Sequence, residues 1–222
     1  SKRLSLNGFK RQRQTDASLI RIYFRYICVQ NRSMYTEYQP SHLLVPYIDS
    51  YWEFKGNPDY GMRIHILPDG CTDFIFTLGE VANAVEEGSL IMQPYRSYFV
   101  GPMTKYSELV TYTESIHMFG VRFLPCGLSC FTNLPLHEFV NSRVSTNEMK
   151  AVFDDTFIEK LGEQKHVTDR IRVVEEYLLA YLARHYQPAD SHVAMAVNMI
   201  NHSKGKRSVR SLMDDVCLCQ RH

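Results

Sequence analysis

Several features that mark whole classes of proteins are missing from this 222-residue chain. Apolar residues make up 45% of it, but no uninterrupted apolar run approaches the ~18 residues of a membrane span, so we expect no membrane partner. The six cysteines are scattered and contain no Cys-x-x-Cys pair, which argues against both a disulfide scaffold and a zinc ribbon. The sequence therefore predicts reduced thiols and a cytoplasmic protein.

The motifs of the common catalytic sites are also missing. The chain has no Gly-rich phosphate loop, no Gly-x-Ser-x-Gly elbow and no His-Glu-x-x-His. Metal-binding cupins usually carry His-x-His, which does not occur here, so we interpret His65, Asp73, Glu114 and His117 as structural residues. We expect no catalytic residues, no metal, no cofactor and no enzyme activity.

Net charge is close to zero, at +1, but the charges are unevenly distributed. Residues 1–33 hold eight basic side chains and one acidic side chain, a net charge of +7. Residues 204–222 hold five basic and two acidic side chains, a net charge of +3. The body between them, residues 34–203, holds 12 basic and 21 acidic residues, or −9. An acidic body disfavours a general polyanion-binding surface there.

Residues 1–33 lack clean periodicity and helix caps, and basic residues break their apolar stretch. We expect a basic N-terminal extension outside the domain. A nucleic-acid-binding arm and a helix packed on the body are the alternatives.

Residues 34–140 are predicted to form an antiparallel, cupin-like β-barrel or sandwich, followed by a C-terminal helical region, which makes the fold class α+β. The predicted strands are Ser50–Phe54, Arg63–Leu67, Thr72–Leu78, Ser89–Met92, Ser97–Val100, Glu108–Tyr112 and His117–Phe123. Pro68-Asp69-Gly70 is a strong turn signal between two of them. It predicts a hairpin of Ile64–Leu67 with Phe74–Leu78.

Residues 141–190 are predicted to be a helical linker and dimerisation region. Ser145 to Glu148 has the sequence of a capping box, and Thr168 can cap a longer helix that Pro188 ends. One face of that helix carries an apolar stripe of Ile171, Val174, Leu178, Tyr181 and Leu182. The stripe either faces the core or forms the seam of a homodimer.

Residues 191–222 have the order of elements of an incomplete helix-turn-helix. A helix is expected over Ser191–His202, and Ser208 can cap a short helix with Val209, Leu212 and Met213 inward. The polar residues Gln220, Arg221 and His222 would begin a third helix and are the predicted DNA-binding residues. The chain reaches only the first turn of this helix, so we expect weak, non-specific DNA binding.

This tail resembles the first helix-turn-helix of the AraC/XylS family of transcription regulators. Five segments of the body also resemble the sensor region of one branch of that family. They are Tyr38-Gln39-Pro40-Ser41, Tyr51-Trp52, Leu67-Pro68-Asp69-Gly70-Cys71-Thr72-Asp73, Val100-Gly101-Pro102 and Gly120-Val121-Arg122-Phe123-Leu124-Pro125-Cys126-Gly127. Met213, Cys217 and Cys219 depart from the family's Ala, Gly and Ser.

The resemblance implies the effector-sensing and dimerisation part of a regulator that binds DNA in its full-length form and answers to an unknown small-molecule effector. The candidate ligand-binding residues are Trp52, His65, Asp73, Phe76 and Arg122. Arg122 could anchor an acidic ligand or pair with an acid such as Asp73. A cupin-like small-molecule-binding protein or enzyme is the alternative function.

Overall fold

The computed structural model describes residues 34–81, 83–84, 91–148, 152–153, 155–185, 191–203 and 205–216. The basic segment 1–33 and the predicted DNA-binding residues Gln220, Arg221 and His222 lie outside the described residues. Within the described ranges, no helix combines the length and apolar character needed to cross a membrane.

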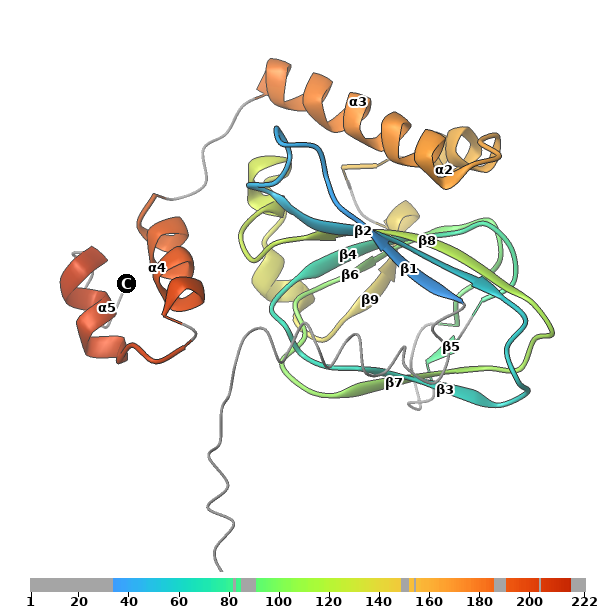
Figure 1. The fold of residues 1–222 in the computed structure, drawn as a ribbon, viewed down its shortest axis with the longest axis horizontal. Helices are drawn as coiled ribbons and strands as arrows, with labels where there is room; N and C mark the ends of the chain where they lie inside the picture. The colour runs from blue at the N-terminus through green and yellow to red at the C-terminus, as the bar shows by residue number, and fades with distance from the viewer. Residues whose placement is uncertain are drawn as a thin grey trace, which may run out of the picture.

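The described strands form two antiparallel sheets that face each other, with helices on the outer face of the larger sheet (Figure 1). The larger sheet contains, in order, β1 (Tyr35–Tyr38), β2 (Ile48–Gly56), β8 (Ile116–Phe123), β4 (Thr72–Thr77), β6 (Ser97–Val100) and β9 (Arg143–Ser145). The smaller contains β3 (Met62–Ile66), β7 (Ser107–Thr111) and β5 (Asn83–Ala84). The fold is therefore α+β, as predicted, and takes the form of the sandwich rather than the closed barrel.

Side chains alternate between the two faces along the central strands of the larger sheet. The helices cover one face and the smaller sheet covers the other, so both faces are buried. Phe74 and Phe76 of β4 point to the helices, whereas Ile75 points to the smaller sheet. The helix-side core also holds Phe119, Phe123, Phe153 and Phe157, among other residues. The inter-sheet core holds Trp52, Phe54, Ile75, Met92, Tyr98, Val100, Leu109, Ile116 and Met118, among others.

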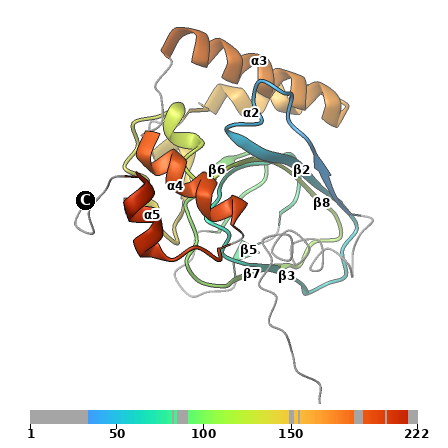
Figure 2. The same ribbon diagram turned by 60° about the vertical axis from the view of Figure 1, so that its left-hand side comes forward.

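Two helices, α2 (Asp155–Gly162) and α3 (Val167–His185), cover the outer face of the larger sheet, and the smaller sheet lies on its other side (Figure 2). The apolar stripe of α3 faces the helix-side core. Val174 and Leu178 are completely buried, and Ile171, Tyr181 and Leu182 pack against the same core. The structure thus selects the core alternative for this stripe, and its buried residues are not available as a dimer seam.

The predicted hairpin across Pro68-Asp69-Gly70 is wrong, although the turn is present and Gly70 has the positive φ of 75° that glycine tolerates. The turn carries the chain from one sheet to the other. β4 is buried on both faces and lies between β6 and β8, whereas β3 is half-exposed and pairs with β7. A strand buried on both faces gains more in the centre of the larger sheet than in a two-stranded ribbon.

The helix start predicted at Ser145 to Glu148 is a single 3-10 turn that follows directly on the larger sheet. Ser145 ends β9, and the residues after it form one 3-10 turn, η4 (Thr146–Glu148). The buried Thr146 hydroxyl is hydrogen-bonded to the hydroxyl of Ser97, which ties this turn to β6. The larger sheet therefore extends to residue 145, beyond the predicted boundary at 140.

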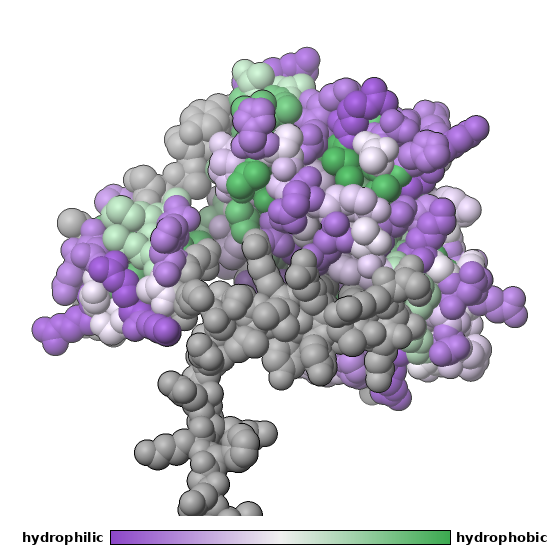
Figure 3. All heavy atoms as spheres, in the orientation of Figure 1, coloured by the Kyte–Doolittle hydropathy of each residue, from purple (hydrophilic) through white to green (hydrophobic). Residues whose placement is uncertain are grey.

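The last two described helices are α4 (Ser191–His202) and α5 (Val209–Val216). Ser208 caps α5 as predicted, because its Oγ accepts the N–H of Ser211 at 3.2 Å. His192 Nδ1 lies 2.9 Å from the carbonyl oxygen of Val216 and links the two helices. The prediction that Val209 points inward is wrong, since this residue is 70% exposed. The space-filling view shows apolar side chains at the surface of the helix pair (Figure 3).

Candidate ligand-binding site

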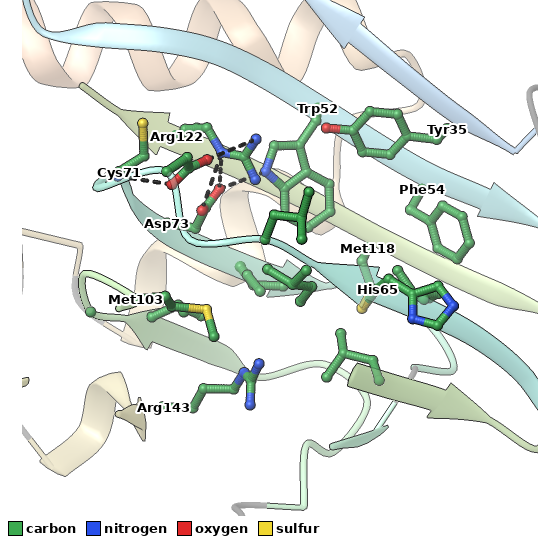
Figure 4. Close-up of a pocket in the computed structure, with 18 residues that line it drawn as sticks. Tyr35, Trp52, Phe54, His65, Cys71, Asp73, Met103, Met118, Arg122 and Arg143 are labelled. Atoms are coloured by element: carbon green, nitrogen blue, oxygen red, sulfur yellow. Dashed lines mark hydrogen bonds and ion pairs between the residues drawn. The ribbon is translucent and has the colours of Figure 1, made fainter. Parts of the chain in front are cut away.

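A cavity of about 80 Å³ lies between the two sheets (Figure 4). Its walls come from β1, β2, β4, β6, β8 and β9 on one side and from β3 and β7 on the other. An apolar cavity of about 150 Å³ accommodates benzene, so a ring of that size enters here only if side chains move. Met103 and Met118 line the cavity, and methionine side chains adapt their shape readily.

Strand register arranges the large-sheet wall in rows. Arg122, Asp73, Val100 and Arg143 are successive cross-strand partners on β8, β4, β6 and β9, and all four line the cavity. We call them the polar row. The next row along the strands consists of Trp52 on β2 and Ile75 on β4, which are the cross-strand neighbours of Gly120 on β8. The row after it contains the paired residues Phe54 on β2 and Met118 on β8. One end of the wall is charged and the rest is apolar.

A buried ion pair of Arg122 with Asp73 forms one end of the polar row. Asp73 Oδ1 accepts the indole N–H of Trp52 at 2.8 Å and the Nε–H of Arg122 at 3.2 Å. Asp69, in the turn between the sheets, places Oδ2 3.8 Å from Nη1 of Arg122 and accepts the backbone N–H of Cys71. Because the Arg122 side chain is only 8% exposed, the carboxylates must offset much of its desolvation.

Burial raises the pKa of Asp73, and attraction to Arg122 opposes that rise. Burial alone would lower the pKa of Arg122, but attraction to Asp73 outweighs it and raises that pKa above its ordinary value. Burial, reinforced by Asp69, also raises the pKa of the Cys71 thiol. A protonated thiol is a poor nucleophile, so this rise in pKa disfavours covalent chemistry at Cys71.

Trp52 can lie against the sheet only because Gly120 has no side chain. A Cβ at Gly120 would lie 1.9 Å from Cε2 of the indole. Tyr35 stacks on the indole, with ring centroids 6.1 Å apart. Aromatic rings therefore form one continuous part of the cavity wall beside the ion pair.

The other polar side chains of the cavity lie at its edges. Arg143 donates from Nη2 to the hydroxyl of Ser107 on β7, at 2.6 Å, and so joins the two sheets. His65, on β3, is hydrogen-bonded through Nδ1 to the hydroxyl of Tyr106, and its Nδ1 lies 3.4 Å from Glu108.

Four of the five predicted ligand-binding residues line this cavity: Trp52, His65, Asp73 and Arg122. The pairing of Arg122 with Asp73 matches the structural alternative for this arginine. Phe76 does not line the cavity. It lies in the helix-side core, because it is three residues from Asp73 and so faces the other side of β4.

Sequence reasoning missed Tyr35, Met103, Met118 and Arg143. Tyr35 and Arg143 belong to strands of four and three residues, which are too short to show a clear alternation.

The four residues weighed as metal ligands are separated in the structure. His117 Nε2 lies 3.0 Å from Glu53 on the helix side of the sheet, whereas His65 and Asp73 line the cavity. Over the ranges that the structure describes, no three His, Cys, Asp or Glu residues are grouped so that they could hold a metal ion.

Residues 36–145 match a family model described as a domain of unknown function, DUF6597. This segment runs from β1 to the end of β9, so the matched domain is sheet-rich and includes nearly the whole cavity wall. No curated protein and no solved structure gives a significant match to the chain.

Proposed function

We propose that this chain is the effector-sensing and dimerisation part of an AraC-like transcription regulator, and that the effector is a small molecule bound between the two sheets. The observation that carries the proposal is the cavity itself, which is apolar over most of its wall and has one charged row at its end. Such a combination favours binding and orienting a small ligand.

The larger sheet supports a sensing role because one of its faces lines the cavity and the other contacts α3, so we call it a shared wall. On β2, Trp52 lines the cavity, while its neighbours Tyr51 and Glu53 point to α3. Glu175 of α3 accepts the hydroxyl of Tyr51 at 3.3 Å, and Glu53 accepts Nη1–H of Arg170 at 3.0 Å. A ligand that favours one arrangement of β2 would therefore shift the population of α3 arrangements.

The helical end of the chain supports the regulator part of the proposal. α3 precedes α4 and the capped α5, an order that fits the linker and the start of a helix-turn-helix. The homodimer in this proposal uses a surface other than the buried stripe of α3.

Ligand binding can be tested through Trp52, which is the only tryptophan of the chain. A panel of small aromatic and aliphatic molecules is titrated while tryptophan emission and the thermal midpoint are measured. We expect a subset to change both, and Ile66→Phe, which fills the cavity from β3, to weaken that response at least tenfold. Val209→Phe adds the same kind of side chain at an exposed position and should leave binding unchanged.

If no molecule changes the emission, or if Ile66→Phe binds as well as the unmodified protein, the cavity is not the sensing site. Stoichiometric metal in protein purified without chelators would instead favour the cupin-like enzyme. Light scattering over a concentration series tests the dimer.

A further inference from the structure

We infer that the ligand of the inter-sheet cavity is an uncharged, mainly apolar molecule of a few carbon atoms, held against Trp52 and Ile75. This inference rests on the proposed binding function and specifies the chemistry of the ligand.

The charged side chains of the cavity wall balance one another. Among the described residues, the wall includes two positive and two negative side chains, Arg122, Arg143, Asp69 and Asp73, so their sum is zero. His65 lies 3.4 Å from Glu108, so a protonated His65 ring would be paired as well. A charged ligand would therefore find no net countercharge in this wall, and an unpaired charge away from water is costly.

The charged side chains of the polar row also hold one another in place. Asp73 Oδ1 accepts from Trp52 and Arg122, and its Oδ2 lies 3.3 Å from Nε of Arg122. Figure 4 shows the Arg122 guanidinium turned toward this carboxylate. Arg143 donates to the hydroxyl of Ser107 at 2.6 Å and makes a further interaction. An ionic ligand would have to displace one of these partners, so the polar row closes one end of the cavity and disfavours a charged head group.

The rest of the wall suits a short chain of carbon atoms. Both sheets contribute apolar side chains to it, namely Trp52, Ile75 and Met118 from the larger sheet and Ile64, Ile66 and Leu109 from the smaller sheet. An apolar ligand would gain dispersion contacts from both sheets at once. At about 80 Å³ the cavity is smaller than the roughly 150 Å³ that holds benzene, so a ring enters only after Met103 or Met118 moves.

The test compares probes of nearly the same shape that differ in charge: butanone with propionate, and butane with propylamine, which is protonated at neutral pH. Affinity is measured by Trp52 emission and confirmed by the shift in thermal midpoint. We expect each uncharged probe to bind at least tenfold more tightly than its charged counterpart.

A size test locates the ligand. Leu109→Ala enlarges the cavity from β7 and should raise the affinity for benzene at least tenfold. Leu43→Ala makes the same change at a position that is 55% exposed and should leave benzene affinity within twofold.

Each result decides a different point. If propionate or propylamine binds as tightly as its counterpart, the uncharged assignment is overturned while the binding function stands. Benzene affinity that Leu109→Ala leaves unchanged would overturn the placement of the ligand against this apolar wall. If none of the five probes alters emission or the midpoint, both proposals fail. Should Leu109→Ala not fold, Ile64→Val removes one carbon from the same wall and takes its place, and the comparison of charge in the unmodified protein needs no variant.

Discussion

Gly120→Ala should destabilise the protein by driving Trp52 off the larger sheet. The added methyl group would lie 1.9, 2.2 and 2.3 Å from Cε2, Cζ2 and Nε1 of the indole, where carbon contacts normally lie at about 3.5 Å or more. The β8 backbone cannot retreat easily, because Gly120 pairs with Trp52 of β2 on one side and Ile75 of β4 on the other. The indole must therefore move by more than about 1 Å.

Two costs follow from this movement. Overpacking a well-filled core costs about 1–3 kcal/mol, and loss of the hydrogen bond from the indole N–H to the buried Asp73 carboxylate costs about 1.5–3 kcal/mol. We therefore expect Gly120→Ala to lower the free energy of unfolding by about 3–5 kcal/mol. For a protein of this size, the thermal midpoint would fall by roughly 6–20 °C. Circular dichroism measures the midpoint, and tryptophan emission reports the displaced ring.

A matched control and a double variant isolate the cause. Gly162→Ala, at the end of α2, adds the same methyl group where nothing lies within 4 Å, and should change stability by no more than about 0.5 kcal/mol. In a Trp52→Leu background the ring is gone, so Gly120→Ala should cost much less than it does alone. A midpoint for Gly120→Ala within 1 °C of the unmodified protein would refute the packing argument.

Three further predictions concern the helices and the charged ends. Glu53→Gln should lower the free energy of unfolding at pH 7 by about 1–3 kcal/mol, because the carboxylate holds His117 and Arg170. The hydrogen bond from His117 is the largest cause that lowers the pKa of Glu53, so this stabilisation is present at neutral pH. The difference between the variants in denaturant unfolding should shrink as the pH falls below the ordinary value of 4.5, and a pH-independent difference would contradict this assignment. Leu178→Asp should unfold the protein, which would be measured as a loss of circular dichroism, whereas the exposed Ala180→Asp should leave it folded. A Leu178→Asp variant that is folded and monomeric would show that the stripe forms the dimer interface. Finally, this chain should bind random duplex DNA weakly at low salt and release it by about 0.2 M, as measured by fluorescence anisotropy; a hundredfold preference for one duplex would overturn that expectation.

Most of the sheet strands could be predicted because short runs rich in Val, Ile, Thr, Tyr and Phe are bounded by turn residues. Ser97–Val100 was predicted with the bounds that the structure shows, and the segments around Trp52 and Phe119 were placed within two residues at most boundaries. What failed was the pairing of strands. A turn signal such as Pro68-Asp69-Gly70 fixes local backbone geometry, but which strand lies beside β4 depends on burial of both its faces, a tertiary property.

In the candidate site, too, local strand geometry could be predicted from the sequence and strand pairing could not. The parity of residue numbers along β4 could have separated Phe76 from Asp73, because positions three apart point to opposite faces of a strand. Arg143 could not have been placed by such counting. It reaches the cavity through a three-residue strand at the edge of the sheet, and only the register with β6 aligns it with Asp73.

The shared wall has a consequence for how a ligand could act. Trp52 and Tyr51 are adjacent on β2, so one lines the cavity while the other holds Glu175 of α3. Glu175 also accepts the backbone N–H of Ser41 at 2.7 Å, which connects the same helix to the chain between β1 and β2. A ligand that shifts Trp52 therefore acts on a strand whose opposite face is bound to α3. Coupling between sites is reciprocal, so under the proposed function a ligand and α3 would change each other's binding by the same free energy.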